Sequence, residues 1–208
     1  GYSNAIAHSL SKEKIENAHL QILKILRIQK NYKLASRKIK ALLADDKFKR
    51  ISGNLELELV NLYRAQGEYD EIQIRLESIA NDYQRTQVSA EAYFQLGELY
   101  TSVKWDLEKA KQYFEKVSKE SNKSIFASSA KTKAISINLY QTTQENIKTL
   151  SLNDTVQRNL DSTKSVSIAT PMKSLPELYY QLADLEAFSF SRYNESIKIF
   201  EKIILEYP

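Results

Sequence analysis

The chain has 208 residues, with 30 Lys and Arg against 26 Asp and Glu, which gives a formal net charge of +4. It contains no cysteine, and this excludes disulfide bonds, thiolate metal sites and cysteine nucleophiles. Only four glycines and three prolines interrupt the sequence, and no apolar run reaches the roughly eighteen residues of a membrane-spanning helix. We therefore expect an all-α protein without a membrane span.

The first predicted elements form a helical hairpin over residues 12–29 and 32–44, joined by a polar turn. Apolar residues recur in it at helical spacing: Ile22, Leu23 and Leu26 in the first helix, and Ala35, Ile39 and Leu42 in the second. The same pattern predicts a second hairpin over residues 55–66 and 69–83, where Gly67 supplies the turn.

A third hairpin is predicted over residues 90–103 and 107–119. The last one begins at Ser174, which forms a capping box with Glu177, continues to about Phe188 and resumes near Tyr193. Each hairpin starts with an apolar anchor, and the first three anchors, Ile22, Leu59 and Leu96, are 37 residues apart.

The anchor of the last hairpin is Leu182, which lies 86 residues after Leu96, or 37 plus 49. One further repeat with an insertion of about a dozen residues therefore fits between them. Its first helix is expected around residues 127–140, where small and apolar side chains recur at helical spacing.

The recurring residues resemble those of the tetratricopeptide repeat (TPR). Gly97 and Ala183 supply small residues at the close approach of two helices, and Phe114 and Phe200 supply the large ring that fills the gap. The closing Pro208 resembles the proline that ends the helices of this family. Some positions depart from the pattern: Glu186 and Leu26 replace an aromatic residue, and Val60 and Leu23 replace a small one.

The resemblance implies a right-handed α-solenoid of about five TPR-like helical hairpins, the fourth with an insertion. We expect residues 1–208 to form a single domain of this kind, as a fragment of a longer chain. The Tyr-Pro ending and the long polar links are similar in style to TPR proteins of the bacterial cell envelope, so we expect a periplasmic or envelope-associated protein. The alternative is a cytoplasmic one.

Residues 144–173 depart from the repeat, because they are rich in Ser, Thr, Asn and Asp and poor in large apolar residues. We interpret them as a loop-rich insertion, with a short helix ending near Leu160 and a loop at residues 162–167. Two interpretations stay open: a surface insertion without a function, or an excursion that binds a partner.

Charge is unevenly distributed along the chain. Residues 1–50 hold twelve basic against four acidic residues, residues 51–120 hold eight against thirteen, and residues 121–208 hold ten against nine. A basic end beside an acidic middle can attract an acidic partner, and the first fifty residues alone can also contact a nucleic acid or an anionic membrane. The simplest interpretation is an ordinary set of solvated helix faces, and we expect no nucleic-acid partner.

Motifs for catalysis are not found in the sequence. The two histidines, His8 and His19, have no partners at the spacing of metal ligands, and there is no glycine-rich phosphate loop. We therefore predict no enzyme activity, no catalytic residue, no metal and no cofactor.

The predicted function is a protein–protein interaction scaffold that binds a peptide or protein segment in a concave groove. The resemblance implies that the first helix of each hairpin lines this groove. The residues expected there are Asn17, Lys24, Arg27, Leu57, Asn61, Arg64, Glu91, Phe94, Glu98, Tyr180 and Asp184. A cytosolic regulatory or sensor module, or the repeat part of a larger enzyme, is the alternative. The sequence does not predict an oligomeric state.

Overall fold

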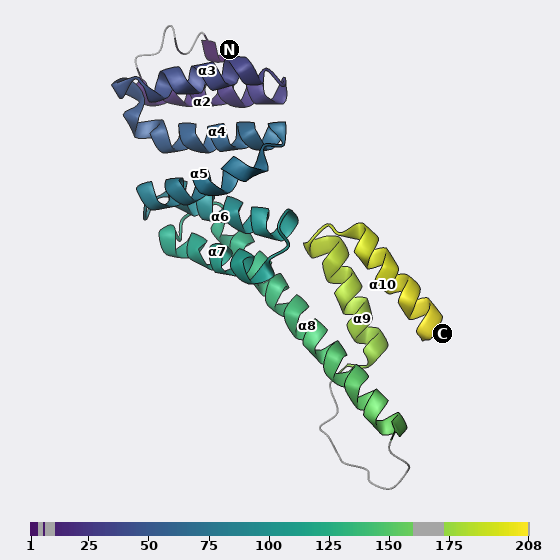
Figure 1. Cartoon of the computed structure of the whole chain (residues 1–208). Helices are drawn as coiled ribbons and strands as arrows, with labels where there is room; N and C mark the ends of the chain where they lie inside the picture. The colour runs from purple at the N-terminus through teal and green to yellow at the C-terminus, as the bar shows by residue number, and fades with distance from the viewer. Residues whose placement is uncertain (4–5, 7–10, 160–172, 208) are drawn as a thin grey trace. The chain divides into compact units, whose positions relative to one another are not determined.

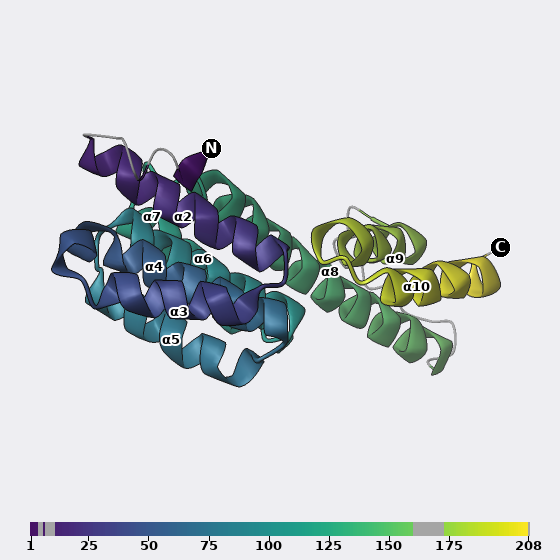
Figure 2. The same cartoon turned by 90° about the horizontal axis from the view of Figure 1, so that it is seen from above.

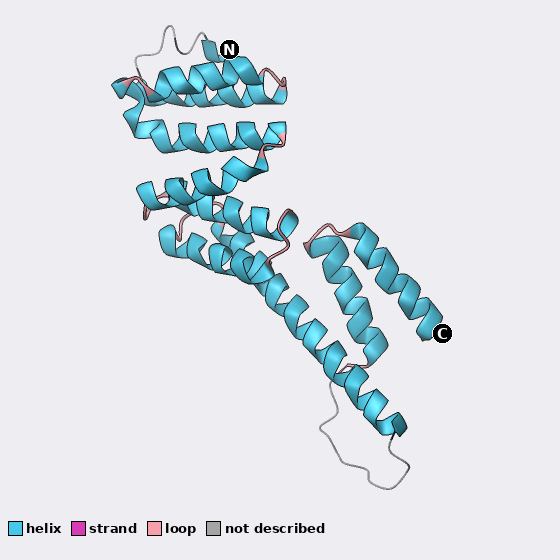
Figure 3. Cartoon of the chain, in the orientation of Figure 1, coloured by secondary structure: helices cyan, strands magenta, loops and turns pink. Residues whose placement is uncertain are grey.

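The computed structural model of the chain describes residues 1–3, 6, 11–159 and 173–207 (Figure 1). Every regular element within these residues is a helix (Figure 3), so the prediction of an all-α fold is confirmed. The chain divides into two compact units. Unit 1 comprises residues 1–104 and 108–130, and unit 2 comprises residues 105–107 and 131–208. The prediction of a single domain over residues 1–208 stays a prediction.

Unit 1 contains the three predicted hairpins, and their helix ends agree with the predicted ends to within three residues. The hairpins are α2 (Lys12–Ile28) with α3 (Tyr32–Leu43), α4 (Ser52–Gln66) with α5 (Tyr69–Asp82), and α6 (Gln87–Ser102) with α7 (Leu107–Glu120). A short 3₁₀ helix, η1 (Asp46–Ile51), connects the first two and was not predicted. The carboxylate of Asp45 caps η1 by accepting a hydrogen bond from the backbone N–H of Lys47 at 3.0 Å.

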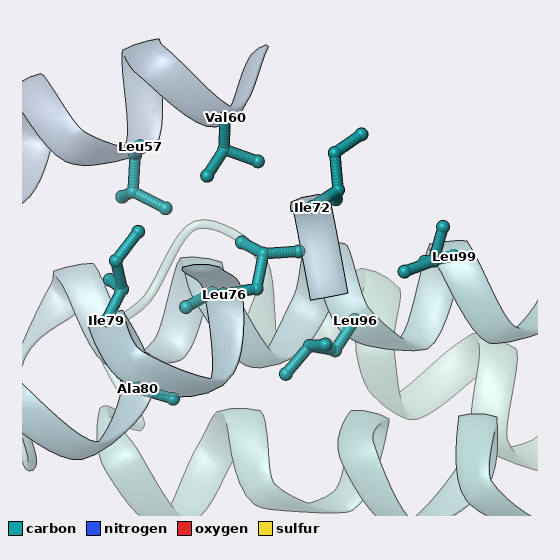
Figure 4. Packing of buried hydrophobic residues seen from close by; sticks show 9 residues of the cluster. Leu57, Val60, Ile72, Leu76, Ile79, Ala80, Leu96 and Leu99 are labelled. Atoms are coloured by element: carbon teal, nitrogen blue, oxygen red, sulfur yellow. The ribbon is translucent and has the colours of Figure 1, made fainter. Parts of the chain in front are cut away.

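Helix α3 packs against α2 and α4, and helix α5 packs against α4 and α6. One core cluster joins Leu57 of α4, Leu76 of α5 and Leu96 of α6, all at most 2% exposed (Figure 4). The turn between α4 and α5 is made by Gly67, whose φ of +79° is the left-handed conformation in which a side chain would be strained.

The close approach within the third hairpin lies where the sequence predicts it. A Cβ built on Gly97 of α6 would lie 2.5 Å from the ring of Phe114 on α7, so only a residue without a side chain fits beside this ring. In the second hairpin the corresponding residues are Val60 and Leu76, which lie in one core cluster. Two side chains of medium size there take the place of a glycine and a large aromatic ring.

Unit 2 contains most of α8 (Ala127–Asn159), followed by α9 (Leu175–Asp184) and α10 (Tyr193–Glu206). Helices α9 and α10 lie side by side in both views of the chain (Figures 1 and 2). The start of α9 has the predicted capping box, in which the backbone N–H and the hydroxyl of Ser174 both donate to Glu177. A π-helical turn, η2 (Leu185–Ser189), extends α9.

The prediction of a loop-rich insertion is wrong for residues 144–159, because α8 continues through them as a helix. Its buried side chains Tyr140 and Ile147 lie in one core cluster with Leu178 and Leu182 of α9. The hydroxyl of Thr149 donates to the backbone carbonyl of Glu145 at 2.9 Å, so a polar residue is accommodated within the helix. Residues 160–172, with the predicted loop at 162–167, lie outside the described residues.

Glu186, which replaces an aromatic residue of the repeat pattern, is 3% exposed in η2. Its carboxylate accepts a hydrogen bond of 2.7 Å from the hydroxyl of Tyr140 and lies 3.3 Å from the guanidinium of Arg192. Arg192 also lies over the ring of Trp105, 3.7 Å from its centroid. Tyr140 and Arg192 both donate to Oε1 of this buried carboxylate, and the positive charge of Arg192 offsets part of the cost of burying it.

Candidate binding groove

Two clefts lie on the first helices of the three hairpins of unit 1. The smaller, of about 300 Å³, is lined by residues of α2, α4 and α6, and the larger, of about 410 Å³, by residues of α4 and α6 with Tyr69 and Phe126. Both clefts are lined by Asn61 and Glu91. We call the two clefts together the first-helix groove.

The structure brings eight of the eleven sequence-predicted residues to this groove. Lys24, Arg27 and Leu57 line the smaller cleft, Arg64, Phe94 and Glu98 the larger one, and Asn61 and Glu91 both. Their spacing explains this placement, because residues three, four or seven apart share one face of a helix.

The other three predicted residues lie elsewhere. Asn17 is exposed on α2 and lines neither cleft. Tyr180 and Asp184 are exposed on α9 in unit 2. Tyr180 packs with its edge against Phe200 at 5.4 Å, and neither residue lines the cleft of about 230 Å³ that α8 and α9 form.

An ion pair crosses the floor of the smaller cleft. The Nε of Arg27 lies 2.7 Å from Oε1 of Glu58, and only 6% of the Glu58 side chain is exposed. Glu58 was missed by the sequence analysis, because its pairing with a residue 31 positions earlier depends on how two hairpins pack. Arg27 is therefore engaged within the protein, while Lys24 of the same cleft is exposed.

Burial shifts the pKa of two charged groups in the larger cleft. Desolvation raises the pKa of Glu91, against a hydrogen bond from the amide of Gln95, which is 3.2 Å away. Desolvation also lowers the pKa of the Arg64 guanidinium, although Glu98 and Glu91 act in the opposite direction. Desolvation therefore makes the charged form of each group less favourable in the folded chain, and groups with shifted pKa values are frequent at functional sites.

Two aromatic rings form a flat apolar wall of the larger cleft. Phe94 of α6 and Phe126, just before α8, stack with centroids 4.8 Å apart and planes inclined by 27°. Phe126 was not predicted. It lies in the link between α7 and α8, where the repeat pattern makes no assignment.

Within the described parts of the chain, no group of three or more His, Cys, Asp or Glu side chains could hold a metal ion. His19 packs edge-on against Phe48 at 5.0 Å, and burial lowers its pKa. His8 lies outside the described residues. Of the helices that the structure describes, none combines the length and the apolar character needed to cross a membrane.

The consecutive helical hairpins of unit 1, with Gly97 against the ring of Phe114 in the third, define a helical-repeat architecture. Neither a protein-family model nor a curated protein matches the chain. Among solved structures, it is similar to a protein of Podosopora anserina described as a kinesin light chain with nearly identical TPR-like repeats. That similarity covers 91% of this chain and 93% of the other, with a TM-score of 0.47 and 13% identity.

Proposed function

We propose that the chain is a non-catalytic interaction scaffold, whose first-helix groove binds an extended segment of another protein. The observation that carries this proposal is that two clefts on consecutive first helices share Asn61 and Glu91. An extended segment can therefore occupy both clefts at once, and its main chain would lie across their shared residues.

The polarity of the groove supports a protein ligand. It combines cations, carboxylates, amides and an aromatic wall, which is the mixture that recognises polar main chain and varied side chains. Asn61 carries one amide donor group and one acceptor in the shared part, which suits the alternating donors and acceptors of an extended backbone.

A selection from a displayed library of random peptides on the intact chain tests this proposal. We expect the selected peptides to lose binding to Asn61→Arg, because a long side chain there obstructs both clefts. Ile74→Arg is the control, since Ile74 is 70% exposed on α5 and lies outside the groove. Melting curves of both variants establish that the fold is intact, and equal binding by Asn61→Arg and the parent would refute the groove.

The setting within the bacterial cell envelope is part of this proposal and rests on sequence style alone. Fractionation of the source cells, with an antibody against the chain, tests it. Recovery in the cytoplasmic fraction would contradict the envelope setting and leave the binding proposal standing.

A further inference from the structure

Among the buried side-chain atoms that line the larger cleft of the first-helix groove, one donor and one acceptor make no hydrogen bond within the described parts of the chain. One is Nη2 of Arg64, a donor, and the other is Oε1 of Gln95, an acceptor. Both residues line the cleft. Buried polar atoms without a partner are rare in folded proteins, and a donor and an acceptor of this kind in one cleft suit a ligand group that supplies both an acceptor and a donor.

The surroundings of the two atoms are fixed by contacts within the protein. Gln95 is 6% exposed, and its amide nitrogen donates to Oε1 of Glu91 at 3.2 Å, which leaves its oxygen without a donor. The carboxylates of Glu98 and Glu91 attract the Arg64 guanidinium through charge, but its Nη2 makes no hydrogen bond. A group that enters the cleft must therefore offer an acceptor to Arg64 and a donor to Gln95.

Charge narrows the choice of ligand group. A carboxylate would accept from Arg64 but would bring no donor, and it would face the carboxylates of Glu91 and Glu98. An ammonium group would donate to Gln95 but would bring no acceptor, and it would face the Arg64 guanidinium. An uncharged amide has both a carbonyl oxygen and an N–H, so it satisfies both atoms and is repelled by neither charge.

The wall of the cleft suits the shape of an amide. Phe94 and Phe126, whose stacked rings have centroids 4.8 Å apart, line the same cleft, and a planar group can pack against aromatic rings. The volume of about 410 Å³ is large enough for a whole side chain together with its main chain.

We propose that the larger cleft is an amide-recognition subsite, in which Arg64 donates to the carbonyl oxygen and Gln95 accepts from the N–H of an uncharged amide. The subsite rests on the proposed function, because the amide belongs to the segment that the groove binds. The source is either the side chain of glutamine or asparagine or a main-chain amide, and the chemistry is the same.

The test uses four peptides, acetyl-Ala-Ala-X-Ala-Ala-amide with X as glutamine, glutamate, lysine or methionine, titrated into the ¹⁵N-labelled intact chain. We expect the glutamine peptide to shift the side-chain amide resonances of Gln95 and to bind about tenfold tighter than the glutamate and lysine peptides. Equal binding by the glutamine and methionine peptides, with the same shifts at Gln95, assigns the subsite to the main-chain amide.

Two substitutions of similar size remove one partner each. Arg64→Met and Gln95→Met should each weaken the glutamine peptide about tenfold, whereas Ile74→Ser, on α5 and outside the groove, should leave its affinity unchanged. If Gln95→Met does not fold, Arg64→Met alone decides. A preference for the glutamate or lysine peptide, or no shift at Gln95 with any peptide, overturns the proposal.

The two proposals fail in different ways. Library peptides that require Asn61 but prefer an acidic side chain at the larger cleft would overturn the amide subsite and leave the groove standing. Library peptides that bind the Asn61→Arg variant would overturn the groove, while the glutamine peptide still reports on the cleft alone.

Discussion

At the close approach of each hairpin, two side chains share one limited volume. Gly97 contacts Phe114, Val60 and Leu76 lie in one core cluster, and so do Leu23 and Ile39. The sequence places Ala183 and Phe200 at the matching positions, and the two members of every pair are 16 or 17 residues apart. Where the second member is a ring, the first is small, and where it is aliphatic, the first is larger. The departures of Leu23 and Val60 from the TPR pattern are therefore compensated within their own hairpins.

This pairing predicts a coupling between Gly97 and Phe114. Gly97→Val should cost about 2–3 kcal/mol of unfolding free energy, because its Cβ alone would lie 2.5 Å from the Phe114 ring. Phe114→Leu should cost about 1–2 kcal/mol through lost contacts. The double variant copies the Val60 and Leu76 pair, and we expect it to be about 1 kcal/mol more stable than the sum of the single changes. Chemical denaturation measures all three, and additive costs would mean that the two positions do not share a volume.

A second residue-scale prediction concerns the carboxylate of Glu91. Burial raises its pKa, so the folded chain binds a proton more tightly than the unfolded chain does. Folding stability is therefore lost as the pH rises from the unfolded pKa through the folded one. Glu91→Gln lacks this penalty, so it should stabilise the chain at neutral pH, by an amount that shrinks as the pH falls through that window.

Thermal melts of the parent and Glu91→Gln across the acidic range measure this difference. Glu145→Gln is a matched control, because Glu145 is exposed on α8. An unchanged or lower melting temperature of Glu91→Gln at neutral pH would mean that the carboxylate is stabilising. The contribution of the Glu91 carboxylate to stability would then be enough to explain why it lies in the groove.

At the scale of elements, the sequence predicts the helices of unit 1 together with their ends, but not the length of α8. In unit 1 the first and last residues of the six helices follow from apolar spacing, because apolar residues continue along one side of each helix. In α8 the buried side is sparse after Tyr140, and Thr and Ser residues cover the rest, so composition favours a loop. The helix persists because Ile147 packs against α9, a contact 31 residues away that no local pattern shows.

Site residues follow the same rule. Groove residues that depend on helix periodicity, such as Asn61 and Phe94, could be predicted from the sequence. Their partners could not: Glu58 reaches Arg27 from another hairpin, and Phe126 reaches Phe94 from a link. Such contacts depend on distances between elements and not on spacing along the chain.

A proline substitution distinguishes the helix from the predicted loop at residues 144–159. Thr149 is exposed on α8, so Thr149→Pro removes no core contact, but it should cost about 3 kcal/mol by breaking a helix interior. Thr149→Ala, the control, should be neutral or slightly stabilising. Denaturation of both variants measures the costs, and a neutral Thr149→Pro would support the loop.

At the scale of the whole molecule, charge along the chain and charge in the groove differ. Residues 1–50 carry a balance of +8, whereas the first-helix groove holds three cations, Lys24, Arg27 and Arg64, and three carboxylates, Glu58, Glu91 and Glu98. The groove is therefore balanced. Long-range attraction of an acidic segment would come from the exposed lysines of the amino-terminal hairpin, since Arg27 is already paired.

This division predicts different outcomes for the two cations of the smaller cleft. Lys24→Glu should slow the association of an acidic peptide from the library and flatten its salt dependence, with little change in stability, because exposed charges act mainly on encounter. Arg27→Gln should instead cost roughly 2–3 kcal/mol of unfolding free energy, because Glu58 would stay buried without its partner.

Lys40→Glu, on α3 and outside the groove, makes the same charge change as Lys24→Glu and is its control. Stopped-flow association at several salt concentrations compares the variants. An equal effect of Lys40→Glu would assign the attraction to net charge alone, and a stable Arg27→Gln would show that the ion pair with Glu58 contributes little to the fold.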